Sequence, residues 1–313
     1  MTFSVMLFMT NSLVAMERAQ REIYISIDSG GALGVIPAYL LNNLEENTGK
    51  KVINMVDGLA GISTGGIIIG LLASGYSAGE ARAFYHQHAQ EIFGAALGGA
   101  LMALFGGQNT QAALPFENLL EEKIGMLKLS EAKKPLFILS SVNGEVITFD
   151  STMAKSNAEH NTTLKEVVRA TASLPVLWPA AKVVFDSGKV INCVDAGVCG
   201  ANDPTPYLYE KLRAKGNTNE MVIYSLGTGF YPASKKTQDL IANNDKSHIK
   251  VIRLEPNLQD IPGYAPTNTL MQNLFAANAS PQQLKLLEER AQQLIDSEEY
   301  ALMEVELSMT QSF

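Results

Sequence analysis

The sequence predicts an α/β fold, in which helices cover both faces of a central sheet. Segments of β type and segments with helical spacing alternate from the beginning of the chain. Residues 64–74 are almost wholly apolar, which is typical of a helix buried against a sheet. Apolar residues make up 46% of the 313 positions and charged residues 18%, so the chain can bury a large core and is not generally disordered.

The first half of the chain supplies the clearest elements. Residues 22–27 form a short β-type run that ends in the glycine-rich turn 28–34. Residues 36–46 follow with leucines at helical spacing and with a proline suited to a first helical turn. We expect a second strand at 52–60, directly before the apolar helix.

The second half continues the alternation. Asn143-Gly144 lies between two β-type runs, 135–142 and 145–149, and is a strong signal for a tight hairpin. Further strands are expected at 189–194, 221–226 and 249–254. The tail, 281–298, has apolar residues at helical spacing among charges, so we expect an amphipathic helix packed on the domain, with partner binding as the alternative.

Composition and charge exclude several classes of protein. With 24 basic against 32 acidic residues the net charge is −8, which gives no electrostatic footprint for nucleic acid. Two cysteines cannot build a disulfide framework. No apolar segment reaches the ~20 residues that a membrane-spanning helix needs. The apolar run near the start has no basic residue before it, unlike a secretory signal.

These observations set the expected organisation and location. Residues 1–21 are expected to form a loosely ordered leader, and residues 22–313 a single domain that includes the C-terminal helix. We expect a cytoplasmic protein or one peripheral at membranes, and export without a classical signal peptide stays open.

The most informative motif is Gly61-Ile62-Ser63-Thr64-Gly65, between a β-type run and the apolar helix. A turn from strand to helix this tight needs glycine two residues before and after the serine, and it leaves the hydroxyl exposed. The N-terminus of the following helix would stabilise negative charge near Ser63. The pattern therefore indicates a nucleophile elbow, although G-x-S-x-G alone also occurs in ordinary flexible turns.

Two further motifs support a catalytic interpretation. Asp28–Gly34 reads Asp-Ser-Gly-Gly-Ala-Leu-Gly, and its glycines allow successive backbone N–H groups to converge on an anion. Its spacing fails the dinucleotide pattern G-x-G-x-x-G, and a purely structural turn is the alternative. Asp195-Ala196-Gly197 places a carboxylate after a predicted strand, where an ordinary Asx turn is the alternative.

Histidine supply argues against a Ser-His-Asp triad. The four histidines are His86, His88, His160 and His248, and none lies in a strand-to-loop context with a partnering acid. A Ser–Asp dyad therefore fits this sequence better than a triad.

The order of these motifs resembles that of the patatin-like phospholipases, which are lipid acyl hydrolases. The glycine-rich loop, the elbow and the acid motif occur in the family's order. Residues 56–66 are very close to the family's elbow, and the segments 169–175 (Arg-Ala-Thr-Ala-Ser-Leu-Pro) and 225–229 (Ser-Leu-Gly-Thr-Gly) also match. The resemblance extends from about residue 22 to residue 296 and implies a three-layer α/β/α fold with a central, mostly parallel sheet.

The resemblance also implies a mechanism. Ser63 would be the nucleophile, Asp195 its general base, and an acyl-enzyme the intermediate, with no metal and no cofactor. An oxyanion hole would come from the loop residues Ser29, Gly30, Gly31 and Ala32. The motif glycines are Gly34, Gly61, Gly65 and Gly197. The implied partners are a lipid substrate, a transient membrane surface and possible activation by another protein, whereas the oligomeric state stays unknown.

The chain departs from the family pattern at three positions. The family loop usually reads Asp-Gly-Gly-Gly-x-Arg-Gly, so Ser29 replaces a glycine and Leu33 replaces the basic residue. A serine fits there only if its φ is not strongly positive. The missing cation removes a partner for a lipid phosphate and leaves neutral esters, galactolipid-type substrates or thioesters open. The acid motif has Ala196 in place of glycine, a milder change.

Several interpretations stay open at this point. The same dyad could serve an acyltransferase or a thioesterase, and a degenerate protein could bind lipid without turnover. Residues 93–107 suit either a mobile apolar lid or a buried helix. Trp178 suits either an acyl channel or the core. Cys193 and Cys199 bracket Asp195 and are expected to be ordinary small residues, with redox control as the alternative.

Overall fold

The computed structural model describes residues 21–94, 113–175, 177–216, 219–244, 248–262, 264 and 280–309. The expected leader lies outside these residues except for Arg21, which begins the first strand. The candidate lid at 93–107 also lies outside them, apart from its first two residues.

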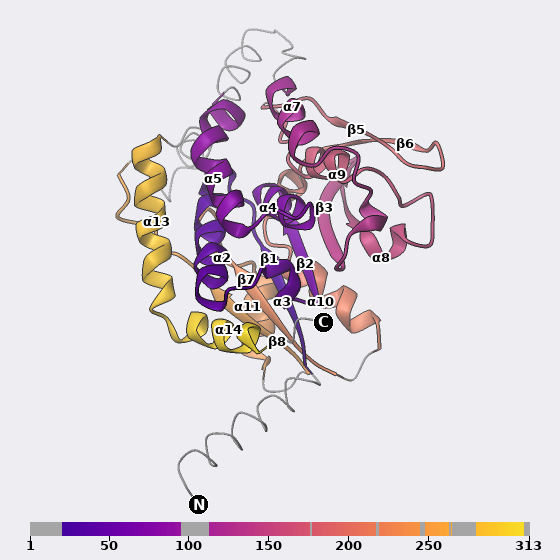
Figure 1. Ribbon diagram of the computed structural model, residues 1–313. Coiled ribbons are helices and arrows are strands. Elements are labelled where there is room, and N and C mark those ends of the chain that lie inside the picture. The colour runs from indigo at the N-terminus through magenta and orange to yellow at the C-terminus, as the bar shows by residue number, and fades with distance from the viewer. Residues whose placement is uncertain are drawn as a thin grey trace, which may run out of the picture.

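A six-stranded sheet in the order β4-β3-β2-β1-β7-β8 forms the centre of the fold (Figure 1). All neighbouring strands are parallel except the β3–β4 hairpin at one edge. The strands are β1 (Arg21–Ile27), β2 (Gly58–Ile62), β3 (Leu136–Val142), β4 (Glu145–Asp150), β7 (Glu220–Leu226) and β8 (Ile249–Leu254). The predicted α/β class with a mostly parallel sheet is confirmed.

Helices cover both faces of this sheet, because successive strand residues point to opposite sides. On β1, Ile23, Ile25 and Ile27 join the larger apolar cluster, whereas Tyr24 joins a second cluster on the other face. The larger cluster packs against α2 (Val35–Thr48), α4 (Thr64–Ala73), α5 (Ala78–Ala89), α7 (Leu114–Lys123), α9 (Leu164–Thr171), α13 (Pro281–Ile295) and α14 (Glu298–Ser308). The second packs against α10 (Thr205–Ala214) and α11 (Lys235–Ala242). The result is three layers.

Short elements complete the chain around the sheet. A separate antiparallel pair consists of β5 (Ala181–Val184) and β6 (Val190–Cys193). The short helices are η1 (Gly31–Gly34), α3 (Val52–Met55), η2 (Gln90–Gly94), η3 (Leu129–Glu131), α8 (Ser151–Ala154) and η4 (Ala196–Cys199). Asn143 and Gly144 both adopt positive φ, at 52° and 85°, as the predicted tight hairpin turn requires.

The predicted strand at 52–60 is wrong in its first half. Residues Val52–Met55 form the single helical turn α3, and β2 begins only at Gly58. The Val52 N–H donates to the Glu45 side chain over 2.8 Å, which fixes the turn against α2. Pairing with β1 starts at Tyr24 opposite Gly58, so the apolar residues before it have no strand partner.

Of two later predictions, the first is confirmed as a strand and the second needs correction. The strand expected at 189–194 exists as β6, but it pairs with β5 outside the central sheet. The tail forms two helices, because Ser297 ends the first segment and caps α14 by accepting from the Tyr300 N–H. Helix α13 packs along α2 and buries Leu284, Leu287 and Ala291 (Figure 1), so the expected packing on the domain is confirmed.

Candidate active site

The carboxyl ends of β1, β2 and β3 bring the three sequence motifs to one edge of the sheet. Ile27 is paired with Gly61, so the loop after β1 and the elbow after β2 lie side by side. Ser141, at the end of β3, forms an isolated bridge with Val194. This bridge places Asp195 beside the same edge, although β6 belongs to the separate two-stranded sheet.

Ser63 occupies a strained backbone conformation between β2 and α4. Its φ and ψ are 53° and −119°, a combination that L-residues adopt at a cost of order 1–3 kcal/mol. Glycines make the turn possible by close approach: a Cβ on Gly65 would lie 2.2 Å from the Ile27 carbonyl oxygen. A Cβ on Gly61 would meet the backbone of Gly65 at 2.7 Å. The geometry is that of the predicted elbow.

Thr171 holds the elbow from the side. The Ser63 N–H donates to Thr171 Oγ1 over 2.8 Å, and the same hydroxyl donates to the Leu139 carbonyl over 2.5 Å. Thr171 is fully buried at the end of α9, so one hydroxyl links the elbow to β3. The Ser63 side chain makes no capping bond to α4 and is left for other contacts.

The Ser63 hydroxyl lies near enough to the Asp195 carboxylate to lower the pKa of that group. Asp195 is buried, its N–H donates to the Ser173 carbonyl, and one carboxylate oxygen accepts from the Gly197 N–H over 2.8 Å. Burial raises the pKa of Asp195 to about 6, while the nearby Ser63 hydroxyl and the bond from the Gly197 N–H lower it. A carboxylate with a pKa near neutrality is suited to accept and return a proton.

Part of the loop after β1 presents free backbone donors. The N–H groups of Gly30, Gly31 and Ala32 donate to no residue in the described part of the chain. Gly30 and Gly31 have φ values of 155° and 56°, which lets successive N–H groups converge. The Ser29 N–H instead donates to the Asn202 carbonyl over 3.0 Å, so the amide of Ser29 is not available for an oxyanion.

The remaining loop positions close the turn against α4 and the core. A Cβ on Gly34 would lie 2.1 Å from Thr64 Oγ1, so the end of the loop rests directly on the residue after Ser63. Leu33 is fully buried in the larger apolar cluster and offers no contact to a substrate head group. Ser29 is absent from the residues with positive φ, which meets the condition for a serine at this position.

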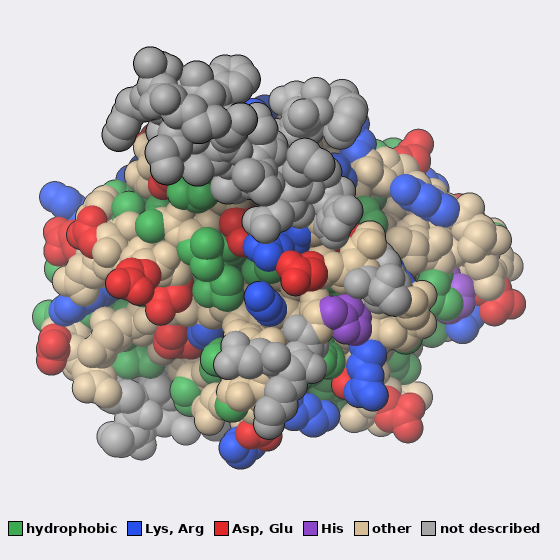
Figure 2. Space-filling model, turned by 90° about the horizontal axis from the view of Figure 1, so that it is seen from below, with side chains coloured by type: hydrophobic (Ala, Val, Ile, Leu, Met, Phe, Trp, Pro, Cys, Tyr) green, Lys and Arg blue, Asp and Glu red, His purple; other side chains and the backbone are tan. Residues whose placement is uncertain are grey.

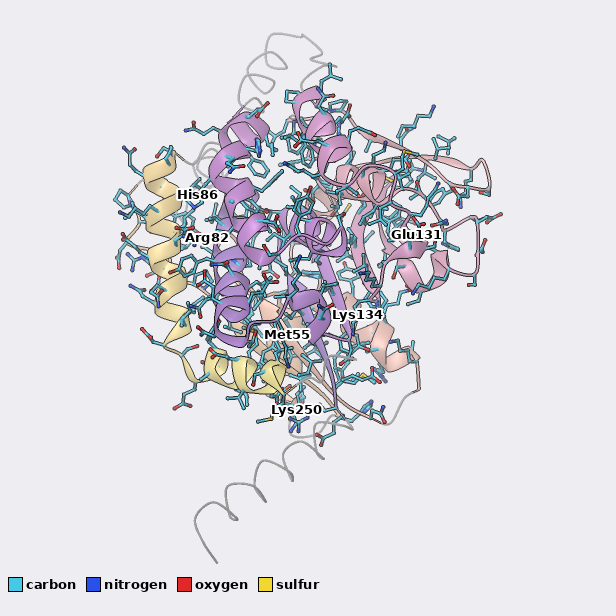
Figure 3. All side chains as sticks on the ribbon, in the orientation of Figure 1. Met55, Arg82, His86, Glu131, Lys134 and Lys250 are labelled. Carbon is cyan, nitrogen blue, oxygen red and sulfur yellow. The ribbon has the colours of Figure 1, made fainter. Side chains whose placement is uncertain are left out.

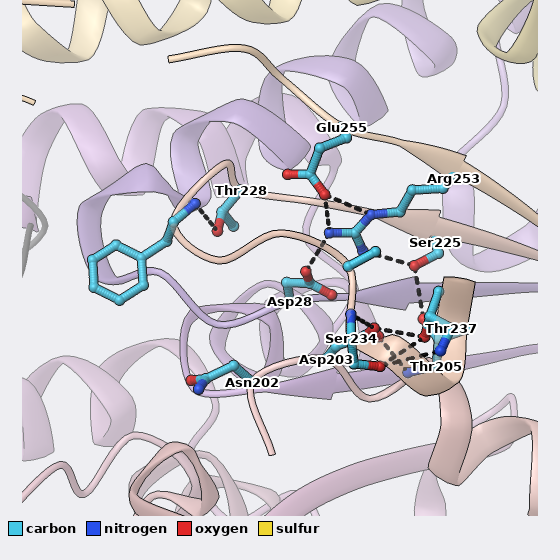
Figure 4. A network of polar contacts seen from close by, with 12 residues as sticks. Asp28, Asn202, Asp203, Thr205, Ser225, Thr228, Ser234, Thr237, Arg253 and Glu255 are labelled. Carbon is cyan, nitrogen blue, oxygen red and sulfur yellow. Dashed lines mark hydrogen bonds and ion pairs between the residues drawn. The ribbon is translucent and has the colours of Figure 1, made fainter. Parts of the chain in front are cut away.

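A buried ionic network anchors the root of the loop (Figure 4). The Arg253 guanidinium on β8 donates to Asp28 over 2.6 Å, to Ser225 over 2.8 Å and to Glu255. Asp28 and Arg253 are both almost wholly excluded from solvent. From the opposite side, Thr228 Oγ1 donates to the Ser29 carbonyl over 2.5 Å, so the loop is fixed at two successive residues.

Sequence reasoning missed the roles of several residues at this site. Thr171 and Thr228 lie in the two segments that matched the family pattern, so a signal existed, but no contact was assigned to them. Asn202 follows the acid motif, and only the fold shows that it meets Ser29. No sequence pattern pointed to Tyr231. Burial raises its pKa, and the charge of the nearby Asp195 carboxylate raises it further.

The histidines and Trp178 lie elsewhere. His86 and Arg82 point from α5 toward α13 (Figure 3), where Glu288 accepts from both, at 2.7 Å and 2.6 Å. All four histidines are described, and none hydrogen-bonds to Ser63 or Asp195. Trp178 is buried and stacks on Phe116 with ring centroids 5.2 Å apart, so it belongs to the core.

The described cavity and the surface in Figure 2 lie away from the dyad or carry no single charge sign. A cavity of about 480 Å³ lies between β4 and the β5–β6 hairpin, and none of the candidate site residues lines it. Acidic and basic side chains are interspersed over the face in Figure 2. Among the described residues there is neither a cluster of three metal-ligating side chains nor a helix long and apolar enough to cross a bilayer.

The sequence and fold of this chain are similar to those of known proteins. The family model of the patatin-like phospholipases matches residues 25–209. Patatin-like protein 3 of Arabidopsis thaliana is 28% identical over 215 residues, which are 58% of this chain and 49% of that protein. Patatin-01 of Solanum tuberosum is 25% identical over 268 residues, which are 75% of this chain and 67% of that protein.

The match in length is partial, since the chain spans about half of the first of these relatives. The crystal structure of VipD from Legionella pneumophila aligns with 88% of this chain and 67% of its own, at 11% identity and a TM-score of 0.42. The family model alone covers more than half of the chain, and the chain belongs to the patatin-like phospholipase family.

Proposed function

We propose that this protein is a serine lipid acyl hydrolase that cleaves carboxylic esters through Ser63 and Asp195. The observation that carries the proposal is the strained elbow of Ser63 next to a buried carboxylate, Asp195, whose pKa is about 6. Family membership supports hydrolysis of lipid esters as the class of reaction.

Acylation needs a nucleophile, a base and donors for the developing charge. Ser63 Oγ attacks the ester carbonyl carbon, and its proton passes to the Asp195 carboxylate. The N–H groups of Gly30, Gly31 and Ala32 bind the oxyanion, a contribution of roughly 3–4 kcal/mol per donor. When the tetrahedral intermediate collapses, the ester C–O bond breaks and the leaving alcohol takes the proton from Asp195.

Deacylation repeats these roles with water. A water molecule gives a proton to Asp195 as its oxygen attacks the acyl carbonyl of the Ser63 ester. The oxyanion accepts hydrogen bonds from the same backbone N–H groups. When the tetrahedral intermediate collapses, the fatty acid is released and Ser63 takes back its proton from Asp195. An alcohol in place of water would make the same site an acyltransferase, so the acceptor decides between the two activities.

The chemistry of the loop bears on the substrate head group. Leu33 stands where the family pattern has a basic residue, and its side chain is buried in the core. Position 33 therefore gives no cation to a phosphate, and we expect esters of neutral lipids to be cleaved at least as well as phospholipids.

The test is hydrolysis of three matched substrates: a galactolipid, a phosphatidylcholine and a diacylglycerol with the same acyl chains, in mixed micelles. Release of free fatty acid by the wild type and its loss in Ser63→Ala would support the proposal. Fatty-acid release that persists in Ser63→Ala would overturn the assigned nucleophile. A folded wild type that releases no fatty acid from any of the three would favour a lipid-binding protein without turnover.

A further inference from the structure

We propose that Ser29 and Asn202 are positioning residues that hold the oxyanion loop (residues 29–32) in register with the acid loop (residues 195–202). The inference rests on the proposed function, because it concerns the relative placement of the oxyanion donors and the base. Neither residue is assigned a contact with the reacting atoms.

Two hydrogen bonds join the loops at the same pair of residues. The Ser29 N–H donates to the Asn202 carbonyl over 3.0 Å, and Ser29 Oγ donates to Asn202 Oδ1 over 2.7 Å. Ser29 is buried, so water competes weakly for either bond. A single hydrogen bond allows the two residues to rotate relative to each other, whereas two bonds between the same pair also fix their relative orientation.

The acid loop transmits this contact to Asp195 through a compact turn. The turn is closed by the Ala201 N–H, which donates to the Ala196 carbonyl over 3.2 Å. Gly197 lies between the two functional side chains: a Cβ there would be 2.8 Å from Asn202 Oδ1 and 3.1 Å from the nearer oxygen of Asp195. The amide of Asn202 and the carboxylate of Asp195 thus both pack against the space that a side chain at position 197 would fill.

The oxyanion loop is also held by two residues outside the acid loop, so its contact with Asn202 joins the acid loop to a fixed segment. Thr228 holds the Ser29 carbonyl, and Arg253 holds Asp28 one residue earlier. Asn202 therefore ties this anchored loop to the loop that carries the base. Without it, the free N–H groups and the carboxylate would sit on two separately supported loops.

The serine at position 29 gives this chain a bond that the usual family residue cannot make. Glycine would preserve the backbone bond to Asn202 and lose the bond from the hydroxyl. The departure from the family pattern therefore has a structural consequence of its own, which is a second bond between the two loops.

The test is a double-mutant cycle on the rate of labelling by a fluorophosphonate probe, with Ser29→Ala, Asn202→Ala and the combined variant. We expect each single variant to label about 5–10-fold more slowly, and the double variant to be no slower than the slower single, since either change removes the same bond. Thr162→Val, which removes a buried hydroxyl bonded to Glu166 and Val184, is the matched control and should label at the wild-type rate.

Asn202→Asp separates positioning from simple stabilisation. It keeps an acceptor for Ser29 Oγ, so labelling at high pH should return toward the wild-type rate. Its added negative charge beside Gly197 should raise the pKa of Asp195, so the acid limb of the pH profile should shift upward from about 6. Labelling of Asn202→Asp at high pH that stays as slow as that of Asn202→Ala would show that the acceptor for Ser29 Oγ does not set the rate.

The outcomes distinguish a failure of this inference from a failure of the proposed function. Single variants that label at the wild-type rate, or a double variant whose loss is the product of the single losses, would overturn this inference and leave the proposed function standing. A wild type that is folded and not labelled would overturn the proposed function and this inference together. Circular dichroism and Tm are measured for every variant, and Ser29→Gly, the family residue, replaces Ser29→Ala if the latter does not fold.

Discussion

The two members of the proposed dyad are held in place by different means. Ser63 sits at the junction of two consecutive elements, β2 and α4, and its position follows from backbone strain and glycine packing within a few residues. Asp195 follows β6, outside the central sheet, and reaches the site through the Ser141–Val194 bridge and a bond to Ser173. The nucleophile is placed locally, whereas the base is placed by contacts between distant parts of the chain.

This difference predicts different effects for substitutions at the elbow and at Asp195. A change at a glycine of the elbow acts on closely packed backbone, so it should cost folding stability before it costs chemistry. A change at the acid acts on a buried charge, so it should cost chemistry and can even improve stability. The four predictions below test that division, from the largest expected effect to the smallest.

Asp195→Asn should lower kcat about 10²–10⁴-fold, because the amide cannot accept the proton of Ser63. In the wild type, kcat should rise with pH through about 6, the pKa to which burial raises Asp195. Steady-state ester hydrolysis between pH 4.5 and 8.5 measures both. A wild-type profile that is flat across pH 6 would remove Asp195 from the role of base.

Gly65→Ala should lower the free energy of unfolding by about 3 kcal/mol, because its Cβ would lie 2.2 Å from the Ile27 carbonyl oxygen. Gly49→Ala is the matched control, because a Cβ on Gly49 would meet no atom within 4 Å. The φ of Gly49 is 67°, so the alanine should lower the free energy of unfolding by only about 1 kcal/mol. Urea unfolding of both variants makes the comparison. Equal losses would show that close packing does not hold the elbow.

Asp195→Asn should raise the stability of the protein at pH 8 by about 3 kcal/mol, opposite in sign to its effect on kcat. The pKa of Asp195 is raised by folding, so the native state holds a proton that the unfolded chain releases above about pH 4. The stability that this proton gives is lost as pH rises through about 6, and the asparagine variant avoids that loss.

Urea unfolding at pH 4 and pH 8 checks the sign. The difference between wild type and Asp195→Asn should be small at pH 4 and large at pH 8. A variant that is less stable than wild type at pH 8 would mean that the carboxylate stabilises the fold, contrary to the burial argument.

Thr171→Val should lower kcat about 10-fold with little change in KM, because it removes the hydroxyl that accepts from the Ser63 N–H and donates to Leu139. Thr171→Ser keeps the hydroxyl and should recover most of the rate. A valine variant as active as the wild type would show that the elbow needs no support from α9.

The same division explains how far the sequence predicts the structure. The elbow, the hairpin turn at Asn143-Gly144 and helix α4 depend on residues next to one another, and local patterns predicted them. The strand at 52–60 failed because its first half is fixed by the Glu45 side chain, which a local pattern does not contain. The pairing of β6 with β5 and the contact of Asn202 with Ser29 join segments through the fold, and no spacing predicts them.

The most direct test of the central claim is to trap the acyl-enzyme. Wild type, Ser63→Ala and Asp195→Asn are mixed with a short-chain p-nitrophenyl ester, quenched in acid within milliseconds and analysed by intact mass and peptide mapping. The account predicts one acyl group on the wild type, located on Ser63, none on Ser63→Ala, and slow accumulation on Asp195→Asn. An acyl group on another residue, or acylation of Ser63→Ala at the wild-type rate, would contradict it.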